Sequence, residues 1–196
     1  MAAPTLAEKQ QQILAHEETL ARQLALAVLE KPTPPIWMIL IPIFFIFFAW
    51  KLKQYSRGLE DFSHHYLISR RRALEAAITA EETGKKVDLN ALLEAAQAVP
   101  EEAKPLYRDW LSLLTEHYRS LLAAHGASHA ALVRACYRDK TSYLLCCTSL
   151  ARAELAFSKA LVPEMQGNTD DLRDVIDRME KALAQLHRQE SEQIFG

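Results

Sequence analysis

The sequence has very little glycine and shows none of the alternation of apolar and polar residues that is typical of strands. Only five of its 196 residues are glycine, while alanine, leucine, glutamate, glutamine, lysine and arginine dominate. These six residue types have the highest helix propensities. We therefore expect an all-α fold.

The chain also lacks the motifs of common catalytic and cofactor-binding sites. It contains no phosphate-binding glycine loop, no nucleophile elbow, and no CxxC, HExxH or CxxCH spacing. His125 and His129 have the spacing of a metal-binding pair on a helix, but a glycine and a serine between them interrupt that helix. We expect no enzymatic activity, no small-molecule substrate, no cofactor and no metal site.

An excess of basic charge is absent as well. The chain carries 23 lysines and arginines against 25 aspartates and glutamates, a formal net charge of −2, whereas nucleic-acid-binding domains are usually strongly basic. Nucleic acid is therefore not an expected partner. Cysteines are also few, and Cys136, Cys146 and Cys147 are most simply free thiols, which favours a reducing compartment.

One long run of large apolar residues lies near the N-terminus. Ten of the fifteen residues 36–50 are Ile, Leu or Phe, and none is charged. As a helix, residues 32–50 would rise about 28 Å, close to the roughly 30 Å hydrocarbon thickness of a bilayer. This pattern predicts a single transmembrane helix. Its anchor residues are Ile36, Trp37, Ile39, Leu40, Ile41, Pro42, Ile43, Phe44, Phe45, Ile46, Phe47, Phe48 and Trp50.

Positive charges set the expected topology of this anchor. Within about twenty residues of it, more basic residues follow than precede it, which places the C-terminal domain in the cytoplasm. Lys51, Lys53 and Arg57 are the residues expected to contact lipid phosphates. Two alternatives remain open, the reversed topology and a re-entrant hairpin in which Pro42 turns the chain back and both ends lie on one side.

The whole chain divides into three segments. We expect an N-terminal amphipathic helix in residues 1–31, a transmembrane anchor with a helical extension in residues 32–57, and a soluble helical-bundle domain in residues 58–196. Apolar periodicity and capping residues predict the helices. The first helix is expected over residues 6–30, and the second runs from the anchor to the residue before Gly84. The others are expected over residues 89–99, 104–124 and 128–162, and from about residue 169 onwards.

The last two helices are expected to form a long antiparallel hairpin, because only a six-residue loop joins them. Narrow apolar stripes with heptad spacing on the first and last helices are candidate partner interfaces. For the last helix, packing against helix 128–162 is the preferred alternative. The candidate interface residues are Leu6, Ile13, Leu20, Leu172, Met179 and Leu186.

The three consecutive arginines Arg70, Arg71 and Arg72 could bind lipid headgroups, but they lie far from the anchor along a continuous helix. A solvated helix face paired with nearby glutamates is the preferred interpretation. The anchor, the heptad stripes and the lack of catalytic motifs together predict a membrane-anchored helical scaffold or adaptor. Its expected partners are membrane lipids and proteins, including copies of itself. The alternative is an accessory subunit of a larger membrane enzyme or transport complex.

Overall fold

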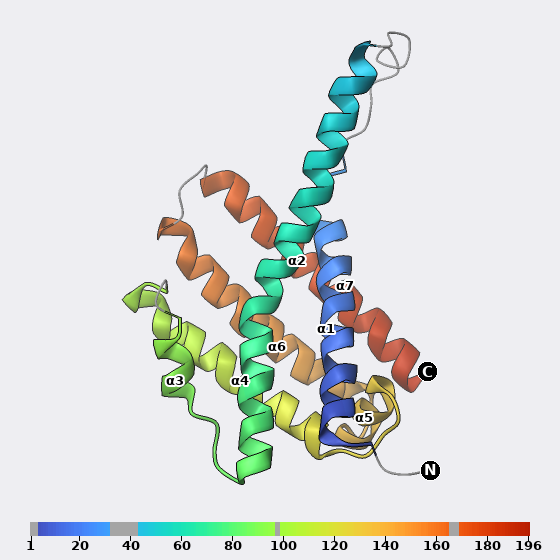
Figure 1. The fold of residues 1–196 in the computed structure, drawn as a ribbon, viewed down its shortest axis with the longest axis vertical. Helices are drawn as coiled ribbons and strands as arrows, with labels where there is room; N and C mark the ends of the chain where they lie inside the picture. The colour runs from blue at the N-terminus through green and yellow to red at the C-terminus, as the bar shows by residue number, and fades with distance from the viewer. Residues whose placement is uncertain (1–3, 32–42, 97–98, 165–168) are drawn as a thin grey trace.

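The chain folds into a bundle of α-helices (Figure 1). The computed structural model describes residues 4–31, 43–96, 99–164 and 169–196. Within these ranges there are seven α-helices and no strand, which confirms the predicted all-α fold. The helices are α1 (Leu6–Val28), α2 (Ile43–Thr83), α3 (Leu89–Glu94), α4 (Lys104–Ala123), α5 (His129–Cys136), α6 (Lys140–Leu161) and α7 (Thr169–Phe195).

Several helix ends are set by residues whose role is readable from the sequence. Thr5 and Glu8 form a reciprocal capping box at the start of α1, in which each side chain accepts from the other's backbone N–H. Gly84 follows α2 with a φ of 66°, the left-handed conformation that favours glycine after a helix. The Asp88 side chain caps α3. The predicted end of α2 at Gly84 is therefore confirmed.

The predicted uninterrupted helix 128–162 is wrong. The structure has two helices there, α5 and α6, separated by Tyr137, Arg138 and Asp139. The Asp139 side chain accepts a hydrogen bond of 2.8 Å from the backbone N–H of Ser142 and so starts a new helix. No glycine or proline marks this break, and the apolar periodicity continues across it. The hairpin predicted at the C-terminus does form, but α6 and α7 alone make it (Figure 1).

The helix predicted within residues 1–31 forms as α1, and it is part of the bundle. It contacts α2, α4, α5 and α7, and it runs antiparallel to α2 (Figure 1). Ile13 and Leu24 are fully buried, and Leu20 is 6% exposed. Near the end of α1, a methyl group added at Gly58 of α2 would lie 3.7 Å from Leu29 Cδ1. The N-terminal helix therefore shares a core with the helices that follow.

Two groups of buried apolar residues hold the bundle together. The larger surrounds α4, whose Trp110, Leu111, Leu114 and Tyr118 are each no more than 4% exposed. The smaller joins α1, α6 and α7 around Leu183. Apolar surface removed from water contributes about 25 cal/mol per Å², so these clusters are the main source of stability. α4 lies centrally, as its broad apolar stripe predicts.

The first part of α2 extends beyond the rest of the bundle (Figure 1). From Ile43 to Gly58, where α1 ends alongside, α2 rises about 22 Å. Among the described residues, no helix is both long and apolar enough to cross a membrane. The described residues therefore give no support to the predicted transmembrane helix. Part of the predicted anchor lies outside the described ranges, namely Ile36, Trp37, Ile39, Leu40, Ile41 and Pro42.

The contacts of α1 conflict with the predicted single-pass topology. One crossing between residues 31 and 51 would leave α1 on the opposite side of the bilayer from α4 and α7. α1 packs against both of these helices. Because α1 and the helices after residue 58 belong to one bundle, they lie on the same side of any bilayer. The chain between them must then cross the bilayer an even number of times or not at all. Of the alternatives named above, only a re-entrant hairpin agrees with this packing.

Candidate functional site

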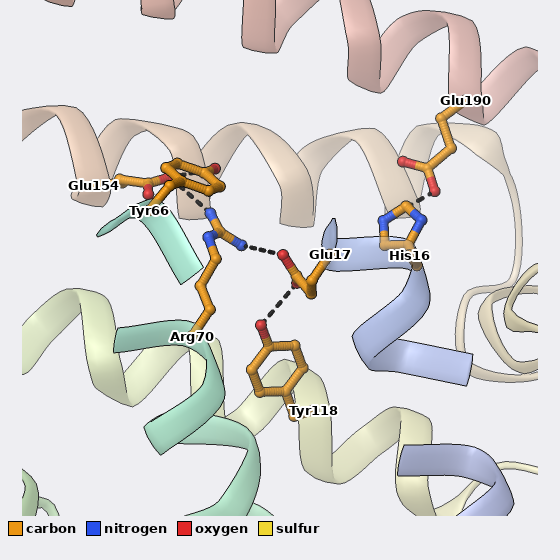
Figure 2. Close-up of polar contacts among 7 residues, drawn as sticks. All are labelled: His16, Glu17, Tyr66, Arg70, Tyr118, Glu154 and Glu190. Atoms are coloured by element: carbon orange, nitrogen blue, oxygen red, sulfur yellow. Dashed lines mark hydrogen bonds and ion pairs between the residues drawn. The ribbon is translucent and has the colours of Figure 1, made fainter. Parts of the chain in front are cut away.

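A buried arginine joins three helices inside the bundle (Figure 2). The Arg70 guanidinium of α2 donates to Glu17 Oε2 of α1 at 3.0 Å and to Glu154 Oε2 of α6 at 2.7 Å. These three side chains are at most 7% exposed. Tyr118 of α4 donates to Glu17 Oε1 at 2.7 Å, and Tyr66 of α2 donates to Glu154 Oε2 at 3.3 Å. We call these five residues the Arg70 network.

Burial sets the protonation states in the Arg70 network. Burial alone would raise the pKa of Glu17, but the charge of Arg70 outweighs burial when it is combined with the effects of His16, Tyr118 and His117, so the pKa lies below its ordinary value. At Glu154 burial prevails over Arg70, and the pKa is raised. Burial also raises the pKa of Tyr66 and Tyr118 well above the usual range, so both hydroxyls stay protonated and act as donors.

The predicted solvent exposure of the three arginines is confirmed for Arg71 and Arg72 and wrong for Arg70. Arg71 pairs at 2.8 Å with Glu18 of α1 and not, as was expected, with a glutamate of its own helix. Arg70 is 6% exposed, because it shares the inward face of α2 with Leu67 and Leu74, which are three and four residues away. An arginine on an otherwise apolar face is buried only when its charge is paired, and two carboxylates from other helices pair it here.

A second polar cluster adjoins the first and brings together α1, α5 and α7. The ring of His16 stacks on that of His129, with centroids 3.7 Å apart and an interplanar angle of 8°. Glu190 Oε1 lies 3.4 Å from His16 Nε2 (Figure 2) and 3.8 Å from His129 Nδ1. The three side chains are between 14% and 23% exposed. We call them the His16 cluster.

The His16 cluster is chemically suited to holding a metal ion. Its three potential ligand atoms all lie within 4.8 Å of one another, and no other such group of three occurs in the described part of the chain. Burial and the neighbouring His16 lower the pKa of His129 to about 2, so His129 is neutral and its ring nitrogen can accept or ligate. Burial raises the pKa of Glu190.

A third polar group lies between α4 and α6, close to the cysteines. His117 Nδ1 is 2.6 Å from the Tyr137 hydroxyl, which donates to Cys146 Sγ at 3.1 Å. Burial lowers the pKa of His117 to about 4. Burial raises the pKa of Cys146 and raises that of Cys136 to about 11, so neither is a thiolate at neutral pH. These thiols are therefore weak nucleophiles.

Most of the predicted partner-interface residues lie inside the bundle. Ile13 is fully buried, Leu20 is 6% exposed and Met179 is 8% exposed. The other three, Leu6, Leu172 and Leu186, are half-buried and packed against the two apolar clusters. This corrects the expectation of a free apolar stripe on the first helix, since heptad spacing indicates burial without identifying the partner helix. For the last helix, the preferred alternative of packing within the chain is the arrangement found.

The predicted lipid-contact residues lie at the projecting part of α2. Lys53 and Arg57 are exposed. Lys51 lies in the helix, in the stretch 43–52 for which only the backbone is described. The same holds for Ile43, Phe44, Phe45, Ile46, Phe47, Phe48 and Trp50 of the predicted anchor.

No local spacing in the sequence predicts the His16 cluster. His16, His129 and Glu190 are separated by 113 and 61 positions along the chain, so no local spacing connects them. One usable signal exists for the Arg70 network, because Arg70 and Glu154 interrupt apolar helix faces where a charge is costly unless paired. His129 was considered, but as the partner of His125, which is exposed and forms no part of the cluster.

Comparison with known proteins identifies no relative. No family, no curated protein and no solved structure matches this chain. The arguments for function therefore rest on the chain itself.

Proposed function

We propose that this protein is a helical adaptor attached to the membrane by a hairpin that enters one leaflet. The observation that carries the proposal is the apolar start of α2, which stands clear of the bundle (Figure 1). The eight residues Ile43 to Trp50 rise about 12 Å, and one leaflet of hydrocarbon is about 15 Å deep. An apolar end of this length suits insertion to the bilayer midplane.

The charges that follow this end support the same placement. Lys51 comes directly after Trp50, and Lys53 and Arg57 follow within two further turns of α2. Basic side chains next to an inserted helix contact lipid phosphates, and each contributes about 1 kcal/mol of attraction to an anionic surface. The bundle would then sit at the membrane surface on the cytoplasmic side, where free thiols persist.

The absence of catalytic motifs in the sequence favours an adaptor over an enzyme. The Arg70 network supports this, because its polar groups are buried against one another with at most 7% exposure of the charged side chains. Such an arrangement fastens helices together and does not present groups to a substrate. In this proposal the bundle provides a rigid body whose surface is positioned by the anchor.

Vesicle flotation of the full-length protein tests the attachment. We expect the wild type to float with anionic vesicles and the double variant Phe44→Asp/Phe47→Asp to remain at the bottom. A charged residue at the centre of an inserted helix costs about 2.5 to 3.5 kcal/mol, so two shift the equilibrium by more than about a thousandfold. Leu145→Asp is the matched control, because Leu145 is 68% exposed and lies on α6.

Two outcomes would overturn the attachment. One is a wild-type protein that stays folded and monomeric in the supernatant without detergent. The other is a double variant that floats as well as the wild type. Far-UV circular dichroism of each variant shows whether the bundle is folded.

Labelling in sealed vesicles tests the hairpin topology. A single added cysteine at Gln11→Cys in α1 or at Lys85→Cys after α2 reports the side of each segment, because both positions are exposed. We expect a membrane-impermeant thiol reagent to label either both added cysteines or neither, measured as the increase over the wild-type chain. Labelling of only one would contradict the hairpin and restore the single pass.

An accessory subunit of a larger membrane complex is the second candidate. A groove between α1 and α2 favours it, since the groove lies next to the projecting end and includes the exposed residues Arg22, Leu26 and Glu60. Leu26 is 59% exposed, which leaves an apolar side chain available to a partner in this groove. A stoichiometric polytopic protein that co-purifies with the wild type and is lost in Leu26→Asp would favour this candidate over the adaptor.

A further inference from the structure

We propose that the His16 cluster binds a divalent transition-metal ion, with Zn²⁺ as the best fit, and that the ion clamps the first helix to α5 and α7. The proposal goes beyond the membrane-attachment function and does not depend on it. Two imidazoles and one carboxylate are a common ligand set for zinc and for other borderline transition metals. A fourth position would be left to water.

The ligand atoms are close to the spacing that the ion requires. Zinc bonds to nitrogen and oxygen at about 2.0 to 2.2 Å, so the atoms around a tetrahedral ion lie about 3.4 Å apart. Glu190 Oε1 is 3.4 Å from His16 Nε2 and 3.8 Å from His129 Nδ1. Because the stacked rings are nearly parallel, binding needs each ring to tilt toward Glu190.

The neighbouring charges favour a cation at this place. Arg70 brings one positive charge to this part of the interior, whereas Glu17, Glu154 and Glu190 bring three carboxylates. A divalent ion bound here would balance the negative charge of these carboxylates.

The surroundings of Glu190 also resemble those of a metal ligand. Tyr143 of α6 lies beside Glu190, where its hydroxyl would hold the carboxylate in position and leave an oxygen for the ion. The three ligand side chains retain between 14% and 23% exposure, which gives an ion a path from solvent. A site of this kind is accessible and still largely desolvated.

Metal binding would couple the two ends of the chain. His16 lies on α1 and Glu190 on α7, separated by 174 positions in the sequence. An ion that binds the folded chain and not the unfolded one raises the stability of the fold in proportion to the logarithm of its concentration. The clamp therefore predicts a melting temperature that depends on zinc.

The test uses the full-length protein in mild detergent, stripped of metal with a chelator and titrated with ZnCl₂ alone. We expect one equivalent of Zn²⁺ to bind and to raise the melting temperature, while the same concentration of MgCl₂ does not. His16→Gln and Glu190→Gln should each weaken zinc binding at least about tenfold, the smallest loss found even for outer-shell partners of metal ligands. His125→Gln is the matched control, since His125 is exposed and lies outside the cluster.

Titration with Co²⁺ gives a readout that does not depend on stability. Tetrahedral coordination of Co²⁺ by two imidazoles and a carboxylate produces visible absorption bands, which should appear in the wild type and in His125→Gln and be lost in His16→Gln. If Glu190→Gln does not fold, Glu190→Asp replaces it and should keep binding with reduced affinity. The proposal is overturned if zinc does not bind stoichiometrically, or if binding survives unchanged in His16→Gln.

Discussion

Replacement of Arg70 by methionine should destabilise the bundle more than any other single charge removal. Methionine retains much of the side-chain volume but leaves Glu17 and Glu154 buried without a counter-charge. Breaking a buried ion pair by removing one partner costs about 3 to 5 kcal/mol. For a domain of this size, 1 kcal/mol corresponds to about 2 to 4 °C, so the melting temperature should fall by about 6 to 20 °C.

Arg71→Met is the matched control for this measurement. Arg71 also pairs with a glutamate of α1, but its side chain is 43% exposed and that of Glu18 is 37% exposed. An exposed ion pair contributes about 0 to 1 kcal/mol, so this variant should melt close to the wild type. Both variants are compared with the wild type by thermal unfolding in the same detergent, followed by far-UV circular dichroism.

The pH dependence separates the loss of charge pairing from a simple packing defect. Without Arg70, burial raises the pKa of both Glu17 and Glu154 in the folded chain above the values of the unfolded chain. The folded variant then binds more protons than the unfolded chain as the pH falls, so its deficit relative to the wild type should shrink. A triple variant with Glu17→Gln and Glu154→Gln added should recover most of the loss.

The reasoning is refuted if Arg70→Met melts within experimental error of Arg71→Met. It is also refuted if the deficit of Arg70→Met grows as the pH is lowered, because that would mean that the carboxylates are not the cause.

Three further predictions concern helix ends and a buried histidine. Gly84→Ala should lower the free energy of unfolding by about 1 kcal/mol, because φ is 66° at this position. Gly58→Ala within α2 should raise it by about 0.5 to 1 kcal/mol. Urea unfolding of both variants checks these opposite signs. Asp139→Ala removes the cap of α6 and should cost about 1 kcal/mol in the same assay, and an unchanged midpoint would contradict the capping role. The pKa of His117 is about 4 in the folded chain and about 6.5 in the unfolded chain, so stability should fall as the pH drops between these values. The loss of stability caused by His117 should be about 2 kcal/mol at pH 5. It should be absent in His117→Gln when the free energy of unfolding is measured from pH 8 to pH 5.

Local signals in the sequence were sufficient for most of the helices. Several elements are identified from neighbouring residues alone. The signals are the apolar periodicity of α1 and α7, Gly84 after α2, and the residues that precede α7. The break before α6 was not predicted, because an aspartate such as Asp139 can equally lie on the surface of a continuous helix. It acts as a cap only because α5 and α6 turn at that point to pack on α4.

The polar clusters could not be predicted by the same means. The pairing of Arg70 with Glu17 and Glu154 requires three helices to meet, and it depends on α1 folding back onto α2. The predicted single pass separates residues 1–31 from residues 58–196, and only the re-entrant alternative allows this arrangement. Heptad spacing at Leu6, Ile13 and Leu20 correctly indicated a buried stripe, but the same spacing fits an outside partner and an inside one.

The packing of α1 against α7 has a consequence for the biosynthesis of the protein. α7 supplies part of the surface that covers α1, and it is made after α1 to α6. At about 5 to 20 residues per second, the ribosome needs about 7 to 30 s to go from residue 50 to residue 196. During this time residues 36–50 are available to a bilayer, while α1 has no complete core to enter. Attachment to lipid would therefore come first, and the bundle would close on a nascent chain that is already tethered.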